Sequence, residues 1–162
     1  PARVPFQILG VWHPALAKRV ASALALLGVE KAWVVHGEDG LDEITLAGDT
    51  FVTACSTNSE PASGLQEFTV SPQNFGLIRR SLTEFRGGGA MENAKLIRAI
   101  LHDEKIGNIA AARDLVIANA AAALHLAGVA PDLMEAATLA RESIATGSAA
   151  AKLDALVRET NR

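Results

Sequence analysis

The amino-terminal part of the chain has the pattern of two short strands separated by one helix, and this pattern constrains the fold most strongly. Residues 4–11 and 31–36 are aliphatic runs, and residues 14–27 between them carry leucine and valine at helical spacing. Pro14 suits the first turn of a helix, and Gly28 suits the position after its last turn. A strand, a helix and a strand in this order form a βαβ unit, which predicts two parallel strands in the centre of a sheet.

The middle of the chain changes to an alternation of apolar and polar residues with period two. Residues 44–46, 50–54 and 65–70 show this alternation, which predicts a small antiparallel section next to the parallel strands. Residues 72–86 have a loop-like composition with one or two short turns. The sheet is therefore expected to be mixed.

The last half of the chain has the apolar spacing of helices. The expected helices occupy residues 90–101, 108–127, 132–147 and 148 onward. Asp132 with Glu135 three residues later resembles a capping box, and Ser148 is expected to cap the final helix. The sequence thus predicts an α/β fold with a mixed sheet and a helical carboxyl-terminal half.

Composition excludes several classes of protein. The 162 residues include 4% aromatic residues and no tyrosine, with a net charge of −3, which argues against a surface that stacks or coats nucleic acid. A membrane span over residues 115–130 is not expected, because Asn119 and His125 interrupt the apolar run. The only cysteine, Cys55, fits a reducing compartment and hence a cytoplasmic protein. Trp12 and Trp33 are expected in or at the end of core strands.

The most informative local feature is a glycine-punctuated acidic segment, residues 37–43, which follows the second predicted strand. Ligands bind at the carboxyl ends of parallel strands in open α/β sheets. Adjacent carboxylates such as Asp42 and Glu43 are hard oxygen ligands of the kind Mg²⁺ takes together with waters and substrate phosphates. The alternative is an acidic surface turn without a ligand. No residue in the chain is identified as a general base.

Three further features have both a functional and a structural interpretation. The NH groups of Gly87–Gly89 could hold an anion at a helix start, or the segment could simply lead into a helix with Glu92 near its positive end. His36 is a candidate to orient the acidic segment, although scattered histidines are more often structural. Asn119 lies in an apolar helix, where an amide needs partners; a packing role is the default interpretation, and the alternative is that it holds a neighbouring loop in place.

The order of motifs along the chain resembles a known enzyme family. The motifs are Pro1-Ala2-Arg3, Gln7-Ile8-Leu9-Gly10-Val11, Val34-Val35-His36-Gly37, Asp39-Gly40-Leu41-Asp42-Glu43, Phe75-Gly76-Leu77, Arg86-Gly87-Gly88, Glu92-Asn93-Ala94, Arg113-Asp114 and Asn119-Ala120-Ala121-Ala122-Ala123-Leu124. Over essentially the whole chain, this series is similar to the carboxyl-terminal half of the anthranilate phosphoribosyltransferases.

The resemblance implies a fold shared with the pyrimidine nucleoside phosphorylases and an activity in tryptophan biosynthesis. The reaction moves phosphoribose from phosphoribosyl pyrophosphate to the amine of anthranilate, with Mg²⁺ as the cofactor. The resemblance also implies that Asp42 and Glu43 bind the metal. Two positions depart from the family pattern: Asn74 replaces a common aspartate, and Gly89 replaces a common acidic residue.

The sequence contains neither the helical domain nor the Gly-Thr-Gly-Gly-Asp loop that open the family's chains. Residues 1–162 are therefore expected to be the carboxyl-terminal portion of the α/β phosphoribosyl-transfer domain, incomplete at its amino terminus and inactive alone. The resemblance places most anthranilate-contacting residues upstream of Pro1, so no substrate-binding residue is assigned here. It implies partnership with the missing amino-terminal half and a possible homodimer of the parent enzyme.

Two other functions remain open at this point. One is a non-catalytic relative of the same fold that binds nucleic acid, which the acidic charge balance disfavours. The other is a relative of the nucleoside phosphorylases.

Overall fold

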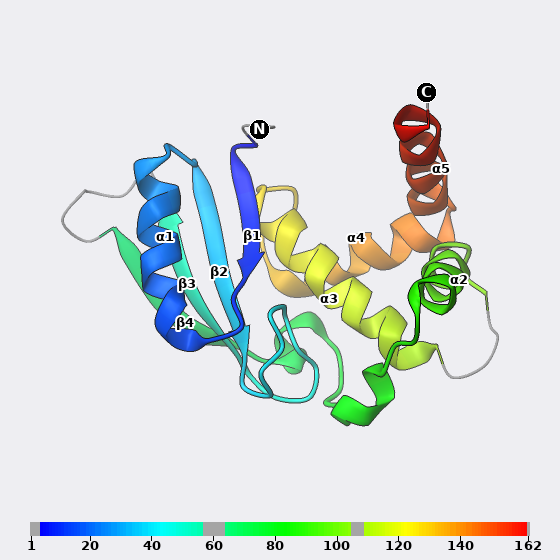
Figure 1. Cartoon of the computed structure of the whole chain (residues 1–162), viewed down its shortest axis with the longest axis horizontal. Helices are drawn as coiled ribbons and strands as arrows, with labels where there is room; N and C mark the ends of the chain where they lie inside the picture. The colour runs from blue at the N-terminus through cyan, green and yellow to red at the C-terminus, as the bar shows by residue number, and fades with distance from the viewer. Residues whose placement is uncertain (1–3, 57–63, 105–108, 162) are drawn as a thin grey trace.

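The computed structural model describes residues 4–56, 64–104 and 109–161. One part of the chain forms a four-stranded sheet, and the other part is helical (Figure 1). The expected α/β fold with a mixed sheet and a helical carboxyl-terminal half is confirmed. Among the described residues, no helix is long and apolar enough to span a bilayer.

The sheet has the strand order β1-β2-β3-β4. Its strands are β1 (Phe6–Gly10), β2 (Lys31–Gly37), β3 (Thr50–Ser56) and β4 (Leu65–Val70). β1 and β2 are parallel, whereas β2, β3 and β4 pair antiparallel. The prediction that both parallel strands are central is wrong for β1, because within the described residues β1 pairs only with β2 and forms an edge.

The predicted strand at residues 44–46 is not a strand. This segment is a loop between β2 and β3, although it is fully buried and alternates in polarity. The NH of Thr45 donates to the hydroxyl of Thr50 at 3.0 Å, and the NH of Ile44 donates to the side chain of Asn119 at 3.0 Å. Side chains thus satisfy the backbone groups that a neighbouring strand would otherwise pair.

The connection between β1 and β2 is helical, as the βαβ pattern requires. A 3₁₀ turn, η1 (Pro14–Leu16), leads into α1 (Ala17–Leu26). His13 caps this entry by accepting a hydrogen bond from the NH of Ala15 at 3.2 Å. Gly28 follows the helix with a φ of 77°, a left-handed conformation that glycine adopts without steric cost.

The segment expected to be loop-like contains two short 3₁₀ turns, η2 (Pro72–Phe75) and η3 (Leu82–Phe85). The helical half consists of α2 (Ala90–Leu101), α3 (Ala110–Leu126), α4 (Leu133–Ala145) and α5 (Ser148–Thr160). Asp132 caps α4 by accepting from the NH of Glu135 at 2.8 Å, as expected. Ser148 does not cap α5: Gly147 holds that position, and the Ser148 hydroxyl bonds to that of Thr146.

Two hydrophobic clusters lie on opposite faces of the sheet. α1 packs on one face against Val34 and Cys55, while α3 and α4 contribute to a larger cluster with Trp33 and Val35 on the other. The sheet is therefore the middle layer of the fold.

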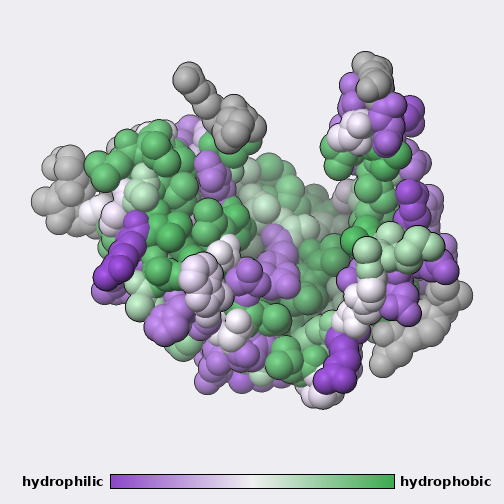
Figure 2. Space-filling view, in the orientation of Figure 1, coloured by the Kyte–Doolittle hydropathy of each residue, from purple (hydrophilic) through white to green (hydrophobic). Residues whose placement is uncertain are grey.

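On the face shown in Figure 2, the surface is hollowed between β1 and α5, and hydrophobic residues form much of the floor.

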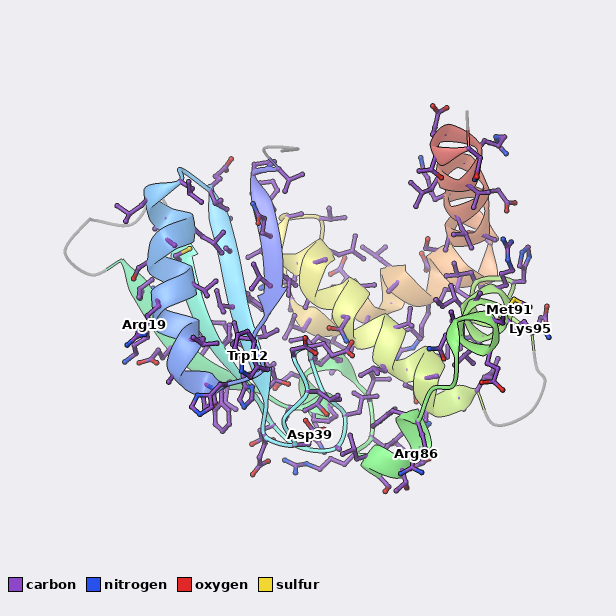
Figure 3. All side chains as sticks on the ribbon, viewed as in Figure 1. Trp12, Arg19, Asp39, Arg86, Met91 and Lys95 are labelled. Atoms are coloured by element: carbon purple, nitrogen blue, oxygen red, sulfur yellow. The ribbon has the colours of Figure 1, made fainter. Side chains whose placement is uncertain are left out.

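The two tryptophans differ in their environment. Trp33 is buried and forms an edge-to-face contact with Phe68, with ring centroids 5.2 Å apart. Trp12 is 76% exposed and lies beyond the last residue of β1, so the expectation that it ends a core strand is wrong. β1 ends at Gly10, and Trp12 lies in the turn that leads to α1 (Figure 3).

Candidate metal centre

The acidic segment, residues 37–43, lies where the sequence predicts it, immediately after the carboxyl end of β2. The NH of Gly37 donates to the carbonyl of Leu41 at 2.8 Å, and that of Gly40 donates to Gly37 at 2.9 Å. Gly40 has a φ of 93°, which a residue with a side chain adopts only with strain. The segment is therefore a tight, hydrogen-bonded loop.

Asp39 belongs to the scaffold of this loop. Its carboxylate accepts hydrogen bonds from the NH of Leu41 at 3.1 Å and from the hydroxyl of Thr45 at 2.5 Å. Figure 3 shows Asp39 and Trp12 at the same end of the sheet. Because both carboxylate oxygens of Asp39 have protein partners, Asp39 is less available to a ligand than its neighbours.

Asp42 and Glu43 are the carboxylates that remain open to a ligand. Asp42 is exposed and Glu43 is partly buried. Among the residues that the structure describes, neither has an ion-pair partner. Burial, followed by the negative charges of Asp42 and Asp39, raises the pKa of Glu43 above its ordinary value. The loop thus holds more negative charge than its surroundings neutralise, which is the electrostatic condition for binding a cation.

The position of Asp42 depends on the absence of a side chain at Gly10. A Cβ at Gly10 would lie 1.5 Å from the carbonyl oxygen of Asp42 and 2.3 Å from its carbonyl carbon. The loop backbone therefore lies directly against the last residue of β1. Sequence reasoning missed this role of Gly10, although glycine inside a strand is a known signal of a close backbone approach.

Of the two interpretations of Asn119, the structure supports the one in which it holds a loop. Its Oδ1 accepts from the NH of Ile44, and its Nδ2 donates to the carbonyl of Ile44, both at 3.0 Å. Asn119 lies in α3, 75 residues further along the chain. The helical half of the protein therefore fixes the end of the acidic loop.

The two open carboxylates of Asp42 and Glu43 fit Mg²⁺, and they are too few for a metal that only protein side chains coordinate. Within the described ranges, no three or more histidine, cysteine, aspartate or glutamate side chains form a cluster able to hold a metal. Mg²⁺ usually keeps several waters and binds through one or two carboxylates together with substrate phosphates. Two neighbouring open carboxylates in a strongly anionic loop satisfy that requirement.

His36 is near the acidic segment in sequence, but its Nδ1 hydrogen-bonds to the carbonyl of Val11 at 2.8 Å. Its ring is buried, and no hydrogen bond joins it to Asp42 or Glu43 in the described structure. His36 therefore fastens β2 to the end of β1. A role in orienting the metal ligands finds no support in these contacts.

The contacts of the glycine-rich segment before α2 favour a structural role in starting the helix over an anion site. Glu92 accepts the NH of Gly89 at 2.7 Å, and the Asn93 side chain accepts the NH of Gly88 at 2.9 Å. These side chains occupy the NH groups that an anion would need.

Cys55 is a free, buried thiol in β3, and burial raises its pKa, which disfavours a reactive thiolate.

Residues 1–150 match the glycosyl transferase family, a/b domain. The chain is 43% identical over 157 residues to an anthranilate phosphoribosyltransferase of Moorella thermoacetica, a match that covers 97% of this chain and 44% of the relative.

Solved structures agree with this match. The chain is similar to the anthranilate phosphoribosyltransferase from Saccharomyces cerevisiae in complex with PRPP and Mg, with a TM-score of 0.79 and 29% identity over 92% of this chain and 41% of that chain. The same yeast enzyme in complex with 4-fluoroanthranilate gives a TM-score of 0.79, again at 29% identity over 92% of this chain and 41% of that chain. The chain thus spans less than half the length of these relatives.

Proposed function

Because the chain belongs to the glycosyl transferase family and matches its a/b domain over residues 1–150, we propose that it is part of an anthranilate phosphoribosyltransferase. Residues 1–162 are, in this proposal, the carboxyl-terminal portion of the phosphoribosyl-transfer domain of a longer protein. The match to less than half the length of the Moorella thermoacetica relative supports this assignment. The 162-residue portion alone is expected to be inactive, because catalytic positioning would need both portions of the enzyme.

The proposed reaction transfers phosphoribose from phosphoribosyl pyrophosphate to anthranilate. The bond between C1′ and the pyrophosphate oxygen breaks, a bond between C1′ and the anthranilate nitrogen forms, and the amine loses a proton. The yeast enzyme with PRPP and Mg and its complex with 4-fluoroanthranilate support this choice of substrates. In this proposal the reaction belongs to tryptophan biosynthesis, as the resemblance implies.

Asp42 and Glu43 carry the proposal within this chain. They would hold Mg²⁺ through their carboxylates at the carboxyl end of β2. A bound Mg²⁺ neutralises the negative charge that develops on departing pyrophosphate. The single supporting observation is that two open carboxylates lie side by side in a loop whose shape is fixed by Gly10 and Asn119.

The decisive experiment measures phosphoribosylation of anthranilate by the full-length protein over a range of Mg²⁺ concentrations. The double variant Asp42→Asn with Glu43→Gln should lose about 100-fold or more of the Mg²⁺-dependent rate, because a metal at a developing charge contributes several kcal/mol. Glu38→Gln is the matched control: it removes a charge from the same loop, and its carboxylate bonds to the NH of Asp49 at 3.1 Å.

The outcomes separate the competing functions. A double variant with unchanged Mg²⁺ dependence would remove the site assignment while leaving the activity in place. Cleavage of a nucleoside by phosphate, with no product from anthranilate, would instead identify a nucleoside phosphorylase. Salt-dependent retention on DNA without either activity would identify a nucleic-acid-binding relative.

The proposal also places the full-length protein in the cytoplasm and includes a homodimer, as the resemblance implies. The free thiol of Cys55 supports a reducing compartment. Sedimentation of the full-length protein measures the oligomeric state directly.

A further inference from the structure

The amide of Asn119 binds the backbone of a single residue in the same way that a neighbouring strand would. It accepts the NH of Ile44 and donates to the carbonyl of Ile44, each at 3.0 Å. The second hydrogen of Nδ2 goes to the carbonyl of Leu115, one turn earlier in α3, at 3.0 Å. Both amide hydrogens are therefore used within the protein. Asn119 therefore has no side-chain donor left for a substrate.

The residue whose backbone Asn119 holds, Ile44, directly follows Asp42 and Glu43, which are called the acid pair from here on. Ile44 comes immediately after Glu43, and its side chain is fully buried. On the other side of the pair, the backbone of Asp42 lies against Gly10, with no room for even a methyl group. The two carboxylates thus lie between two fixed points of the backbone. One point belongs to the sheet and the other to α3.

Repulsion between carboxylates that are held close together destabilises this loop, and the hydrogen bonds between Asn119 and Ile44 offset that destabilisation. Asp39, Asp42 and Glu43 are three carboxylates of one short loop that backbone hydrogen bonds close tightly. Like charges repel, so a loosely held loop would separate them. A loop held in place keeps the carboxylates together before a cation arrives, which removes the cost of gathering them at the moment of binding.

We propose that Asn119 is a positioning residue that sets the cation affinity of Asp42 and Glu43 by clamping Ile44. This inference rests on the proposed function, since it takes the acid pair to be the metal site. Asn119 itself touches neither metal nor substrate in this scheme. Its contribution is the geometry of the loop.

The test measures the affinity of the full-length protein for Mn²⁺, a paramagnetic substitute for Mg²⁺, by electron paramagnetic resonance with phosphoribosyl pyrophosphate present. Asn119→Ala should weaken Mn²⁺ binding by about 10- to 100-fold, the range typical of residues that support metal ligands. Excess Mg²⁺ should restore the rate of Asn119→Ala, because the defect lies in affinity rather than in the amount of folded enzyme.

The chain offers a matched control in Asn93. Its side chain clamps Gly88 by the same pair of hydrogen bonds, at 2.9 Å to the NH and 3.1 Å to the carbonyl. Asn93→Ala therefore removes an equivalent clamp at the entry to α2, away from the acidic loop. It should leave the Mn²⁺ affinity unchanged. Ile144→Val, a buried substitution in α4, controls for loss of stability without touching the loop.

The results distinguish this inference from the proposed function. If Asp42→Asn with Glu43→Gln retains wild-type Mn²⁺ affinity, the metal site itself is wrong. If that variant loses Mn²⁺ while folded Asn119→Ala retains it, the site stands and the positioning role is overturned. Should Asn119→Ala fail to fold, Asn119→Ser gives the same decision, since wild-type affinity in the folded serine variant also overturns the role.

Discussion

Replacing Gly10 by alanine tests the close contact between β1 and the acidic loop. Two effects of opposite sign compete. Alanine restricts the unfolded chain and by itself stabilises a protein by about 0.4–1 kcal/mol. Against this, the new Cβ would lie 1.5 Å from the carbonyl oxygen of Asp42, whereas ordinary contacts begin at 3.4 Å. The obstacle is backbone, so the loop must move by about 2 Å, and overpacking of this kind costs about 1–3 kcal/mol or more.

The large displacement favours the upper end of the overpacking range, so after the opposing gain is subtracted we expect Gly10→Ala to lower the free energy of unfolding of the full-length protein by about 2 kcal/mol. Urea unfolding followed by circular dichroism measures this change. The displaced Asp42 should also weaken Mn²⁺ binding in the resonance assay. Gly89→Ala is the control, because its Cβ would meet only the Glu92 carboxylate, at 3.8 Å, and its φ is −68°. That control should cost about 1 kcal/mol or less.

A Gly10→Ala protein that is as stable as the wild type, or slightly more stable, would refute the reasoning. Such a result would mean that only the unfolded-state effect operates and that the loop does not lie against β1. If the variant is destabilised but binds Mn²⁺ as tightly as the wild type, then the contact between Gly10 and the loop exists but does not affect the acid pair.

Two further predictions concern a charge and the two tryptophans. The pKa of Glu43 is raised in the folded state, so this carboxyl lowers stability once the pH exceeds its ordinary value. Glu43→Gln should therefore raise the melting temperature at neutral pH, with a difference that shrinks as the pH falls from the raised pKa toward the ordinary value of 4.5 and that has vanished below it, and a constant difference across pH would contradict the assigned cause. Trp33→Ala should cost about 3–5 kcal/mol and Trp12→Ala less than about 0.5 kcal/mol; urea unfolding checks both, and equal losses would show that Trp12 is not exposed.

The sequence predicts most of the elements because local patterns determine them. The βαβ unit, the antiparallel strands β3 and β4 and the four long helices follow from apolar spacing and from glycine at helix ends. The predicted strand at residues 44–46 is absent for a physical reason. Its alternating polarity is that of a strand, but the partner that satisfies its backbone is a side chain, Asn119, from a distant helix.

The acid pair and the loop-holding role of Asn119 could both be predicted, but their connection could not. Local spacing identifies carboxylates after a strand and an amide in an apolar helix. Nothing local indicates that the amide binds the residue next to the carboxylates. The same limit applies to Gly10, because its contact with Asp42 joins the end of β1 to the loop after β2, and only the parallel pairing of β1 and β2 brings these two together.

The hydrogen bonds between Ile44 and Asn119 have a consequence for how the protein folds. They join positions 75 residues apart, one from the sheet and one from the helical half. Contacts of such large sequence separation form only after the intervening chain has paid its loop-closure entropy, so they belong to the late stages of folding. The acidic loop therefore acquires its shape only when α3 has docked on the sheet. A partly folded chain with a complete sheet would bind the cation more weakly than the native protein, and the recovery of full Mn²⁺ affinity during refolding would time the docking of the two halves.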